Sequence, residues 1–376
     1  RFPTAKDRSE TEWANSDLNR VRPNLSQDRH TAVSCSQENT TMAELEPLNP
    51  ADAKAMYLTQ RESEVSESTH NAHDYRLRHF VRWCELEDID NLNELTARSI
   101  FEYRQWRKQD GDLNQVSLKT QLSTLKIFLR FCESIDAVED GLSEKMMIPT
   151  LAEGEDTREG MLEAEQARAL LSHLGKFEYA STKHALVTVL WHTSCRIGGL
   201  HSLDVSDFDA ENHSLSFKHR PDTGTSLKNG ASGERIVALS AEVTTILEDY
   251  IETNHPKVED EYGREPLFAT KGGRWHKSNI RQRVYAVTRP CYYSGECPHG
   301  RDLDLCEANS YDQASKCPSS NPPHDIRRGS ITHYLKDDVP TGAISDRANV
   351  SAKIMERHYN QMSDEEKMEQ RREFFD

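Results

Sequence analysis

Residues 323–335 read PHDIRRGSITHYL, which puts a histidine and an arginine three residues apart on one expected helix. Three other stretches carry related side chains. Residues 192–200 read HTSCRIGGL after an apolar helix, and residues 227–237 read LKNGASGERIV, a glycine-rich turn between two expected strands. Residues 345–359 read SDRANVSAKIMERHY. In chain order, the side chains of interest in these four stretches are Arg196, Lys228, His324, Arg327, Arg347 and Tyr359.

These residue types suit chemistry at a phosphate. Two arginines can hold the non-bridging oxygens of one phosphate in a bidentate way. A tyrosine beside them can attack phosphorus, since the arginines stabilise both the phenolate and the pentacoordinate transition state. A histidine can take the phenolic proton, and a lysine can protonate the leaving oxygen. Because guanidinium groups replace a metal ion in such a site, we expect no cofactor to be required for catalysis.

With these stretches in this order ahead of a short C-terminal tail, the sequence resembles the tyrosine recombinase (phage integrase, Xer-like) family over roughly residues 50–376. Its acidity makes it similar to the haloarchaeal members. The family's Thr-Gly-x-Arg-x-x-Glu-Leu box corresponds to residues 193–200, and its His-x-x-Arg box to residues 324–327. The resemblance implies a mainly α fold with a small antiparallel β-sheet (α+β). A SAM-like helical core-binding domain is then followed by a tyrosine-recombinase catalytic domain.

The resemblance also implies a role for each residue. Tyr359 attacks the scissile phosphate and forms a 3′-phosphotyrosyl link, so that rejoining needs neither ATP nor metal. Lys228 protonates the 5′ oxygen, with Lys218 as its alternative, and His324 is the general base. Tyr334 is the rival nucleophile, although it lies seven residues past the arginine of its box. The phosphorane is stabilised by Arg196, Arg327 and Arg347.

The sequence departs from the family pattern at three positions. The glycine of the first box is Ser194, and its glutamate is Gly199. Arg347 stands where the family has a histidine or tryptophan, and an arginine there can still donate to a phosphate oxygen. The family resemblance therefore predicts an active enzyme with an altered third box.

Composition sets the wider limits. The chain has 376 residues, a formal net charge of −16 and a mean hydropathy of −0.80. No run of 18 apolar residues and no signal-peptide core is present, so we expect a cytoplasmic protein. Acidic excess argues against nucleic acid at ordinary salt, because phosphate binding needs clustered cations. It fits equally a halophilic protein, whose surface carboxylates keep it hydrated in concentrated salt.

The chain is expected to divide into four parts. Residues 1–41 carry six basic and six acidic residues without periodicity, which indicates a disordered or non-native extension ahead of Met42. Residues 50–134 show helical periodicity and form the core-binding domain; the histidines on its second helix are expected to be exposed or DNA-facing. Residues 135–157 are a linker and residues 158–376 the catalytic domain, with strands expected at 214–217 and 234–238.

A cysteine-rich loop precedes the His-x-x-Arg box. Zinc takes cysteine and histidine ligands, although its usual Cys-x2-Cys spacing is missing here. One hypothesis is a structural zinc that pins this loop, and the alternative is a set of reduced or partly disulfide-linked cysteines. The candidate zinc ligands are Cys291, Cys297, His299, Cys306 and Cys317.

The expected partner is double-stranded DNA, bound by two molecules at each of two sites, which makes a homotetramer; accessory directionality factors are further candidate partners. Two alternatives remain open from the sequence. A type IB topoisomerase-like enzyme would relax supercoils as a monomer without site preference. A non-catalytic DNA-binding regulator descended from an integrase would tolerate loss of the Tyr359 hydroxyl. The sequence indicates neither the target site nor the biological outcome of recombination.

Overall fold

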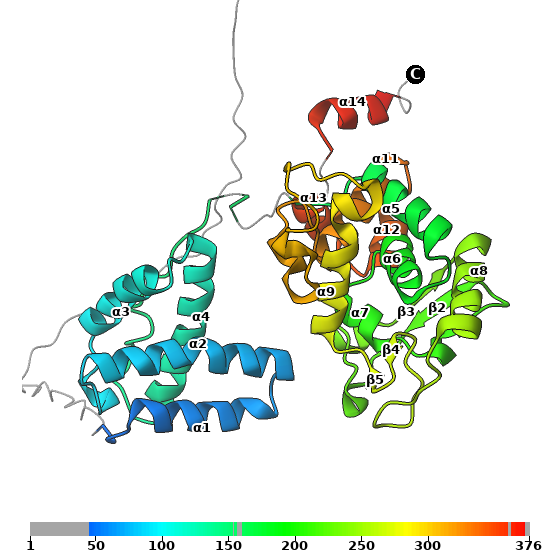
Figure 1. Cartoon of the computed structure of the whole chain (residues 1–376). Helices are drawn as coiled ribbons and strands as arrows, with labels where there is room; N and C mark the ends of the chain where they lie inside the picture. Colours follow the sequence, from blue (N-terminus) through cyan, green and yellow to red (C-terminus); the bar gives the residue numbers. More distant parts are fainter. Residues whose placement is uncertain (1–44, 153, 156–159, 360–361, 373–376) are drawn as a thin grey trace, which may run out of the picture. The chain divides into compact units, whose positions relative to one another are not determined.

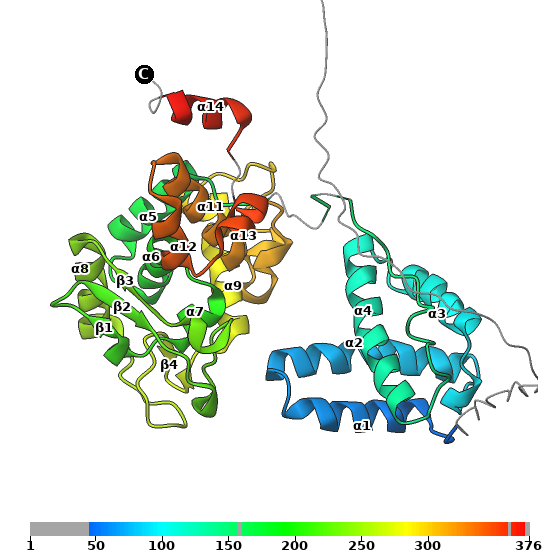
Figure 2. The ribbon, with the colours of Figure 1, turned by 180° about the vertical axis from the view of Figure 1, so that it is seen from behind.

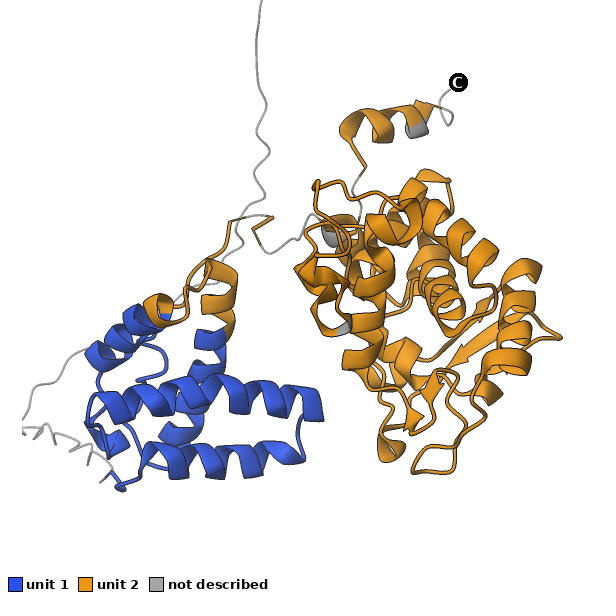
Figure 3. Ribbon diagram, viewed as in Figure 1, with its two compact units in different colours: residues 1–107, 121–147 blue, residues 108–120, 148–376 orange. Residues whose placement is uncertain are grey.

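The computed structural model describes residues 45–152, 154–155, 160–359 and 362–372, so the predicted extension at 1–41 lies outside the described residues. The chain forms two compact units, coloured separately in Figure 3. We call residues 45–107 with 121–147 the N-terminal bundle, and the described residues of 108–120 and 148–376 the C-terminal unit. None of the described helices is long and apolar enough to cross a membrane.

Helices make up the N-terminal bundle (Figures 1 and 2). Its elements are α1 (Pro50–Glu62), α2 (Glu67–Leu86), a 3₁₀ turn (Leu92–Glu94) and the greater part of α3 (Ala97–Asp110) and of α4 (Gln115–Ser134). The end of α3 and the start of α4, within residues 108–120, are grouped with the C-terminal unit. Asn49 and Ser66 begin α1 and α2, because each side chain accepts a hydrogen bond from a backbone N–H of the first turn. The predicted helical character of this region is confirmed.

Aromatic rings fill the core of the bundle. Phe80 and Tyr103 meet edge to face with their centroids 5.4 Å apart, a favoured geometry for ring pairs. The expectation that the histidines of α2 are all exposed or DNA-facing is wrong for His73, which is 6 % exposed. Its Nδ1 lies 2.8 Å from the Tyr57 hydroxyl, so the ring belongs to the core.

The C-terminal unit is built around α6 (Thr182–Thr193), whose residues 184–191 are all buried. A helix that is apolar on every side needs neighbours on every side. Helices of this unit surround it in Figures 1 and 2. Those that pack against α6 are α5 (Ala164–Phe177), α8 (Ala241–Asp249), α9 (Lys277–Thr288) and α11 (Pro323–Lys336). The unit also contains α7 (Ile197–Ser202), α10 (Pro290–Ser294), α12 (Thr341–Ala348), α13 (Ala352–His358) and α14 (Asp364–Arg372).

A three-stranded antiparallel sheet lies beside these helices, in the order β1 (Phe208–Asp209), β2 (Ser214–Phe217), β3 (Arg235–Ala238). Leu215 pairs with Val237, and both side chains are buried in the main core. The predicted strands are confirmed, and the small antiparallel sheet with them. A separate two-stranded hairpin pairs β4 (Ala269–Thr270) with β5 (Gly273–Arg274).

A second, smaller core forms where α11, α12 and α13 meet. Its buried members are Ile331, Ile344, Ala348, Val350, Met355 and Tyr359. On its other side α11 approaches residue 162 so closely that a Cβ atom at Gly329 would lie 1.9 Å from the Leu162 carbonyl oxygen. Only glycine fits there, so this contact fixes how deep α11 lies.

Candidate active site

Arg327, one turn into α11, is completely buried. Its Nη1 donates to the backbone carbonyls of Ser194 and Ala348, the latter at 2.7 Å. Its Nε donates to the Tyr359 hydroxyl at 3.3 Å. Its Nη2 is buried and has no hydrogen-bond partner among the described residues. A buried guanidinium with one donor group left over is well suited to an incoming anion.

Tyr359 ends α13 and is 4 % exposed. The guanidinium carbon of Arg327 lies 5.1 Å from the centre of its ring, and the His324 ring centre lies 5.5 Å away. Thr332 fixes the backbone, because its Oγ1 donates to the Tyr359 carbonyl at 2.6 Å. The structure thus brings the predicted nucleophile, base and second-box arginine together, from segments 32 residues apart.

Arg196 faces the same place from the start of α7. Its Nη1 donates to the Asn349 carbonyl at 2.9 Å. Burial and then the positive charge of Arg327 lower the pKa of Arg196, while Tyr359 acts in the opposite direction. No carboxylate forms an ion pair with either arginine in the described part of the chain. Two close positive charges without a counter-ion favour binding of an anion such as a phosphate.

The corner between α6 and α7 positions this arginine. Ser194 takes a left-handed conformation, with φ of 50°, and ends α6. Its hydroxyl lies 2.6 Å from that of Ser330 on α11, which in turn donates to the Trp191 carbonyl. A side chain in this conformation costs free energy that glycine would avoid. Here the hydroxyl contact between α6 and α11 offsets part of it.

Lys228 is exposed on the turn between β2 and β3 and lines a small hollow together with Arg196. The alternative lysine, Lys218, lies elsewhere, because its Nζ pairs with the Asp207 carboxylate at 2.9 Å. Asp207 also receives two bonds from Arg220, so this carboxylate belongs to a structural ion-pair group. The geometry favours Lys228.

Arg347 has different partners from those predicted. Its Nε and Nη2 donate to the His192 carbonyl at 2.8 and 2.5 Å, and its Nη1 donates to the Ala238 carbonyl at 2.9 Å. Tyr334, the rival nucleophile, also donates to the His192 carbonyl, at 2.9 Å. All three guanidinium nitrogens of Arg347 are thereby used on backbone. The structure does not bring Arg347 or Tyr334 to the arginine pair.

Two residues beside the arginine pair, Arg235 and Asn349, are absent from the predicted set. Asn349 follows α12 in a left-handed conformation, with φ of 49°, which asparagine tolerates well. Arg235 opens β3, and its pKa is lowered to about 10 by burial and by the charges of Arg327, Arg196 and Arg347. The sequence signals were the Glu-Arg-Ile-Val run after the turn and an asparagine placed to end a helix. The hollow is lined by Arg196, Gly199, Leu227, Lys228, Gly233, Arg235 and Asn349.

The predicted structural zinc at Cys291, Cys297, His299, Cys306 and Cys317 is not supported. Among the described residues, no group of three or more His, Cys, Asp or Glu side chains is arranged to hold a metal ion. The Nε2 of His299 lies 3.0 Å from the Ser319 hydroxyl. Arg289, which follows α9, connects the loop to the end of that helix, since it donates to the Ala308 carbonyl at 2.7 Å and to Asn309 at 2.9 Å.

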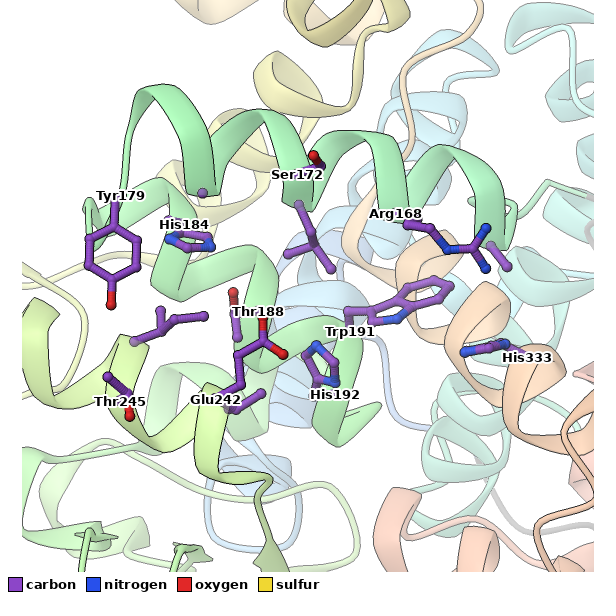
Figure 4. A pocket seen from close by; sticks show the side chains of 15 residues that line it. Arg168, Ser172, Tyr179, His184, Thr188, Trp191, His192, Glu242, Thr245 and His333 are labelled. Atoms are coloured by element: carbon purple, nitrogen blue, oxygen red, sulfur yellow. The ribbon is translucent and has the colours of Figure 1, made fainter.

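A separate cavity of about 740 Å³ lies beside α5, α6 and α8 (Figure 4). Its wall combines apolar side chains such as Leu171 and Trp191 with polar ones such as His184, His192 and Glu242. The lining residues include none of the predicted catalytic set. His192, one of the lining residues, also accepts a hydrogen bond from Arg347 at its carbonyl.

The fold and the arginine–tyrosine cluster together define a class of protein. Residues 57–134 match the phage integrase N-terminal SAM-like domain, and residues 161–300 match the phage integrase family. The chain belongs to this family and is a tyrosine-type site-specific recombinase. The second match ends at residue 300, so the positions of His324, Arg327 and Tyr359 rest on the geometry above.

Individual relatives agree with that assignment. The chain is 21 % identical over 311 residues to a probable integrase/recombinase protein of Methanocaldococcus jannaschii, covering 80 % of this chain and 84 % of the relative. It shares the fold of the Tn1549 transposon integrase in complex with transposon right end DNA, with a TM-score of 0.61, 14 % identity and coverage of 88 % and 100 %. It also shares the fold of a lambda integrase dimer bound to a COC′ core site, with a TM-score of 0.56, 12 % identity and coverage of 84 % and 78 %.

Proposed function

We propose that this recombinase cleaves and rejoins double-stranded DNA through a 3′-phosphotyrosyl intermediate, with no ATP and no metal ion required. The observation that carries the proposal is the Tyr359 hydroxyl held 3.3 Å from Nε of a fully buried arginine whose Nη2 is unpartnered among the described residues. Arg196, without a carboxylate partner in the same part of the chain, completes a pair of cations that a phosphate would bridge.

The roles follow from the positions. The Tyr359 oxygen attacks phosphorus, and the bond from phosphorus to the 5′ oxygen breaks. The phenolic proton passes to His324, and Lys228 gives a proton to the leaving 5′ oxygen. Arg196 and Arg327 stabilise the charge on the phosphorane. Rejoining is the same sequence in reverse, because the phosphotyrosyl bond conserves the energy of the phosphodiester.

Arg347 takes a supporting role in this proposal. Its three bonds to the carbonyls of His192 and Ala238 hold α12 against α6 and β3. Because α12 supplies the Ala348 carbonyl that orients Arg327, Arg347 acts on the phosphate site through the backbone.

DNA and a second copy of the chain are the proposed partners. Residues 50–134 would form the core-binding domain, residues 135–157 the linker and residues 158–376 the catalytic domain, closing around the duplex. The solved structures that share this fold include integrases bound to their own DNA sites, one of them as a dimer, which supports this proposal. Two molecules on each of two sites would give a tetramer.

The test is a covalent trapping experiment. A duplex library with a randomised core, nicked so that the short cleaved piece is lost, is incubated with the full chain in KCl and a chelator. Covalent complexes are isolated under denaturing conditions, and their DNA is sequenced. We expect a covalent band with an enriched site, lost in Tyr359→Phe and retained in Tyr334→Phe, the matched control on the other tyrosine.

Other results would point to the alternatives. A covalent band without any enriched sequence, together with relaxation of supercoiled plasmid by the monomer, would favour a topoisomerase-like enzyme. Site-specific binding without a band on any sequence would favour a non-catalytic regulator. A covalent band that is retained in Tyr359→Phe and lost in Tyr334→Phe would identify Tyr334 as the nucleophile.

A further inference from the structure

The tip of the β2–β3 turn is fastened to the segment that follows α12. Arg235 makes the main connection, because its Nε donates to the Arg347 carbonyl at 2.8 Å and its Nη1 to the Gly233 carbonyl at 3.0 Å. One side chain thus joins the turn to the end of α12. Asn349 adds a second connection, accepting a bond from Asn229 at 3.4 Å.

The packing around these bonds is tight. A Cβ atom at Gly233 would lie 2.7 Å from the Lys228 carbonyl oxygen and 3.1 Å from Asn349 Nδ2. The guanidinium carbon of Arg235 also lies 4.1 Å from the centre of the buried Phe217 ring. A Cβ at Gly199 would lie 3.3 Å from that ring, so the missing side chain at 199 leaves the ring room. The tip of the turn therefore has little freedom while these contacts hold.

The fastened segment also reaches the arginine pair. The Asn349 carbonyl receives Arg196, and the preceding Ala348 carbonyl receives Arg327. Residues 347–349 therefore contact both phosphate-binding arginines and the turn that carries Lys228. Ten residues after Asn349 comes Tyr359.

We propose that Arg235 and Asn349 are positioning residues that clamp the tip of the β2–β3 turn onto residues 347–349 and so place Lys228 where the leaving 5′ oxygen is protonated. This rests on the proposed function, with Lys228 as the general acid. Neither residue touches the reacting atoms in the proposal. In the proposal their side chains serve Lys228, whereas the backbone carbonyls of residues 348 and 349 serve the arginine pair. Loss of these side chains therefore has a signature different from loss of an arginine of the pair.

The test compares two nicked duplexes, one with the natural 5′ oxygen at the cleaved bond and one with sulfur in its place. A thiolate leaves without being protonated, so the sulfur substrate does not need a general acid. We expect Lys228→Ala to slow single-turnover cleavage of the oxygen substrate by about 10²–10⁴-fold. Arg235→Lys should cost on the order of 10²-fold, as misplacement of a catalytic group does. On the sulfur substrate all of these rates should return close to that of the unsubstituted chain.

Asn349→Gly is the gentler variant. Glycine keeps the left-handed backbone and the carbonyl that receives Arg196, and removes only the side chain. Asn349→Gly should lower the cleavage rate on the oxygen substrate alone, by on the order of 10-fold. It also replaces Arg235→Lys in the test if circular dichroism shows that Arg235→Lys does not fold. Arg220→Lys is the matched control: its bonds go to Asp207 and Ser202, away from the tip, so it should show no preference for the sulfur substrate.

Equal slowing of Arg235→Lys and Asn349→Gly on both substrates would overturn the clamp, and so would full activity of both on the oxygen substrate. Failure of the sulfur substrate to restore cleavage by Lys228→Ala would also overturn the clamp, because Lys228 would then not be the general acid that the clamp is proposed to position. No covalent product from the unsubstituted chain on either substrate is a distinct result, which would end the proposed function itself.

Discussion

At the scale of single residues, the departures from the family pattern have visible consequences. Ser194 stands where the family has glycine, and it keeps the left-handed backbone by contacting Ser330 at 2.6 Å. Gly199 stands where the family has glutamate, and a side chain there would press on Phe217, which supports Arg235. Both departures are therefore accommodated by the side chains packed against them, Ser330 and Phe217.

Replacement of Arg327 by lysine tests the arginine pair. Lysine is a point charge and cannot serve the Ser194 and Ala348 carbonyls, the Tyr359 hydroxyl and a phosphate together. We expect Arg327→Lys to reduce single-turnover cleavage by on the order of 10²–10³-fold, measured as covalent complex in the folded protein. The sulfur substrate should not rescue it.

Arg347→Lys is the matched comparison. Its bonds go to backbone carbonyls only, so we expect a loss of about 1.5–3 kcal/mol in the free energy of unfolding. The cleavage rate of the folded fraction should change far less than in Arg327→Lys. A variant with normal stability and severely reduced cleavage would instead return Arg347 to the phosphate, as predicted from the sequence.

At the scale of elements, the depth of α11 determines where Arg327 lies. Gly329 is the contact point, because a Cβ there would lie 1.9 Å from the Leu162 carbonyl oxygen, a backbone atom that cannot turn aside. We expect Gly329→Ala to lower the free energy of unfolding by about 1–3 kcal/mol and to shift α11 away from Leu162. Thermal unfolding monitored by circular dichroism measures this.

Gly198→Ala provides the control for that variant. Nothing lies within 4 Å of a Cβ at this position, so alanine there should be harmless or slightly stabilising. Equal melting temperatures for Gly329→Ala and the unsubstituted chain would show that α11 does not need the close approach.

At the scale of the whole molecule, two half-buried histidines make stability depend on pH. Burial, and secondarily the charges of Arg347 and His333, lower the pKa of His192 to about 4, and burial with nearby Lys277 and Arg274 lowers that of His201 to about 4. Between about pH 6.5 and 4 the unfolded chain binds these protons and the folded chain does not. The free energy of unfolding should therefore decrease as the pH is lowered from about 6.5 to about 4, by up to about 1.4 kcal/mol per pH unit for each histidine.

Thermal unfolding at about pH 7 and about pH 5 checks this. His192→Gln and His201→Gln should each reduce the difference in melting temperature between the two conditions. The exposed His299→Gln should leave it unchanged. A difference that is the same in all four proteins would assign the pH dependence to other groups, such as carboxylates or the buried His73 and His184, whose pKa values burial also lowers.

The net charge of −16 makes a further prediction for the whole chain. If the acidic surfaces face away from DNA, binding should persist at about 1 M KCl with a shallow dependence on salt, because these repulsions are screened. Fluorescence anisotropy on the enriched site across a KCl series measures the slope, and Lys228→Ala should reduce it by about 1. Steep loss of binding at moderate salt would contradict the adaptation to salt predicted from composition.

The local sequence determined most of the secondary structure and the identity of the main chemical groups. Helical periodicity, helix caps and a glycine-rich turn act over a few residues, so they placed the helices and the small sheet. The His-x-x-Arg spacing sets both side chains on one turn of α11, and the two boxes with the late tyrosine sufficed to anticipate the cluster of Arg196, Arg327 and Tyr359.

The tertiary structure alone decided which candidates meet. Arg347 and Asn349 are two residues apart. Yet at the end of α12 the Arg347 side chain donates to backbone carbonyls, whereas Asn349 lines the hollow beside Lys228. The cysteines share a loop, but Arg289 connects it to the end of α9 and they form no metal site among the described residues. The bonds of Arg347 join segments more than a hundred residues apart, and those of Arg289 span about twenty residues of a loop without regular spacing. Neither kind of contact is specified by local periodicity along the chain.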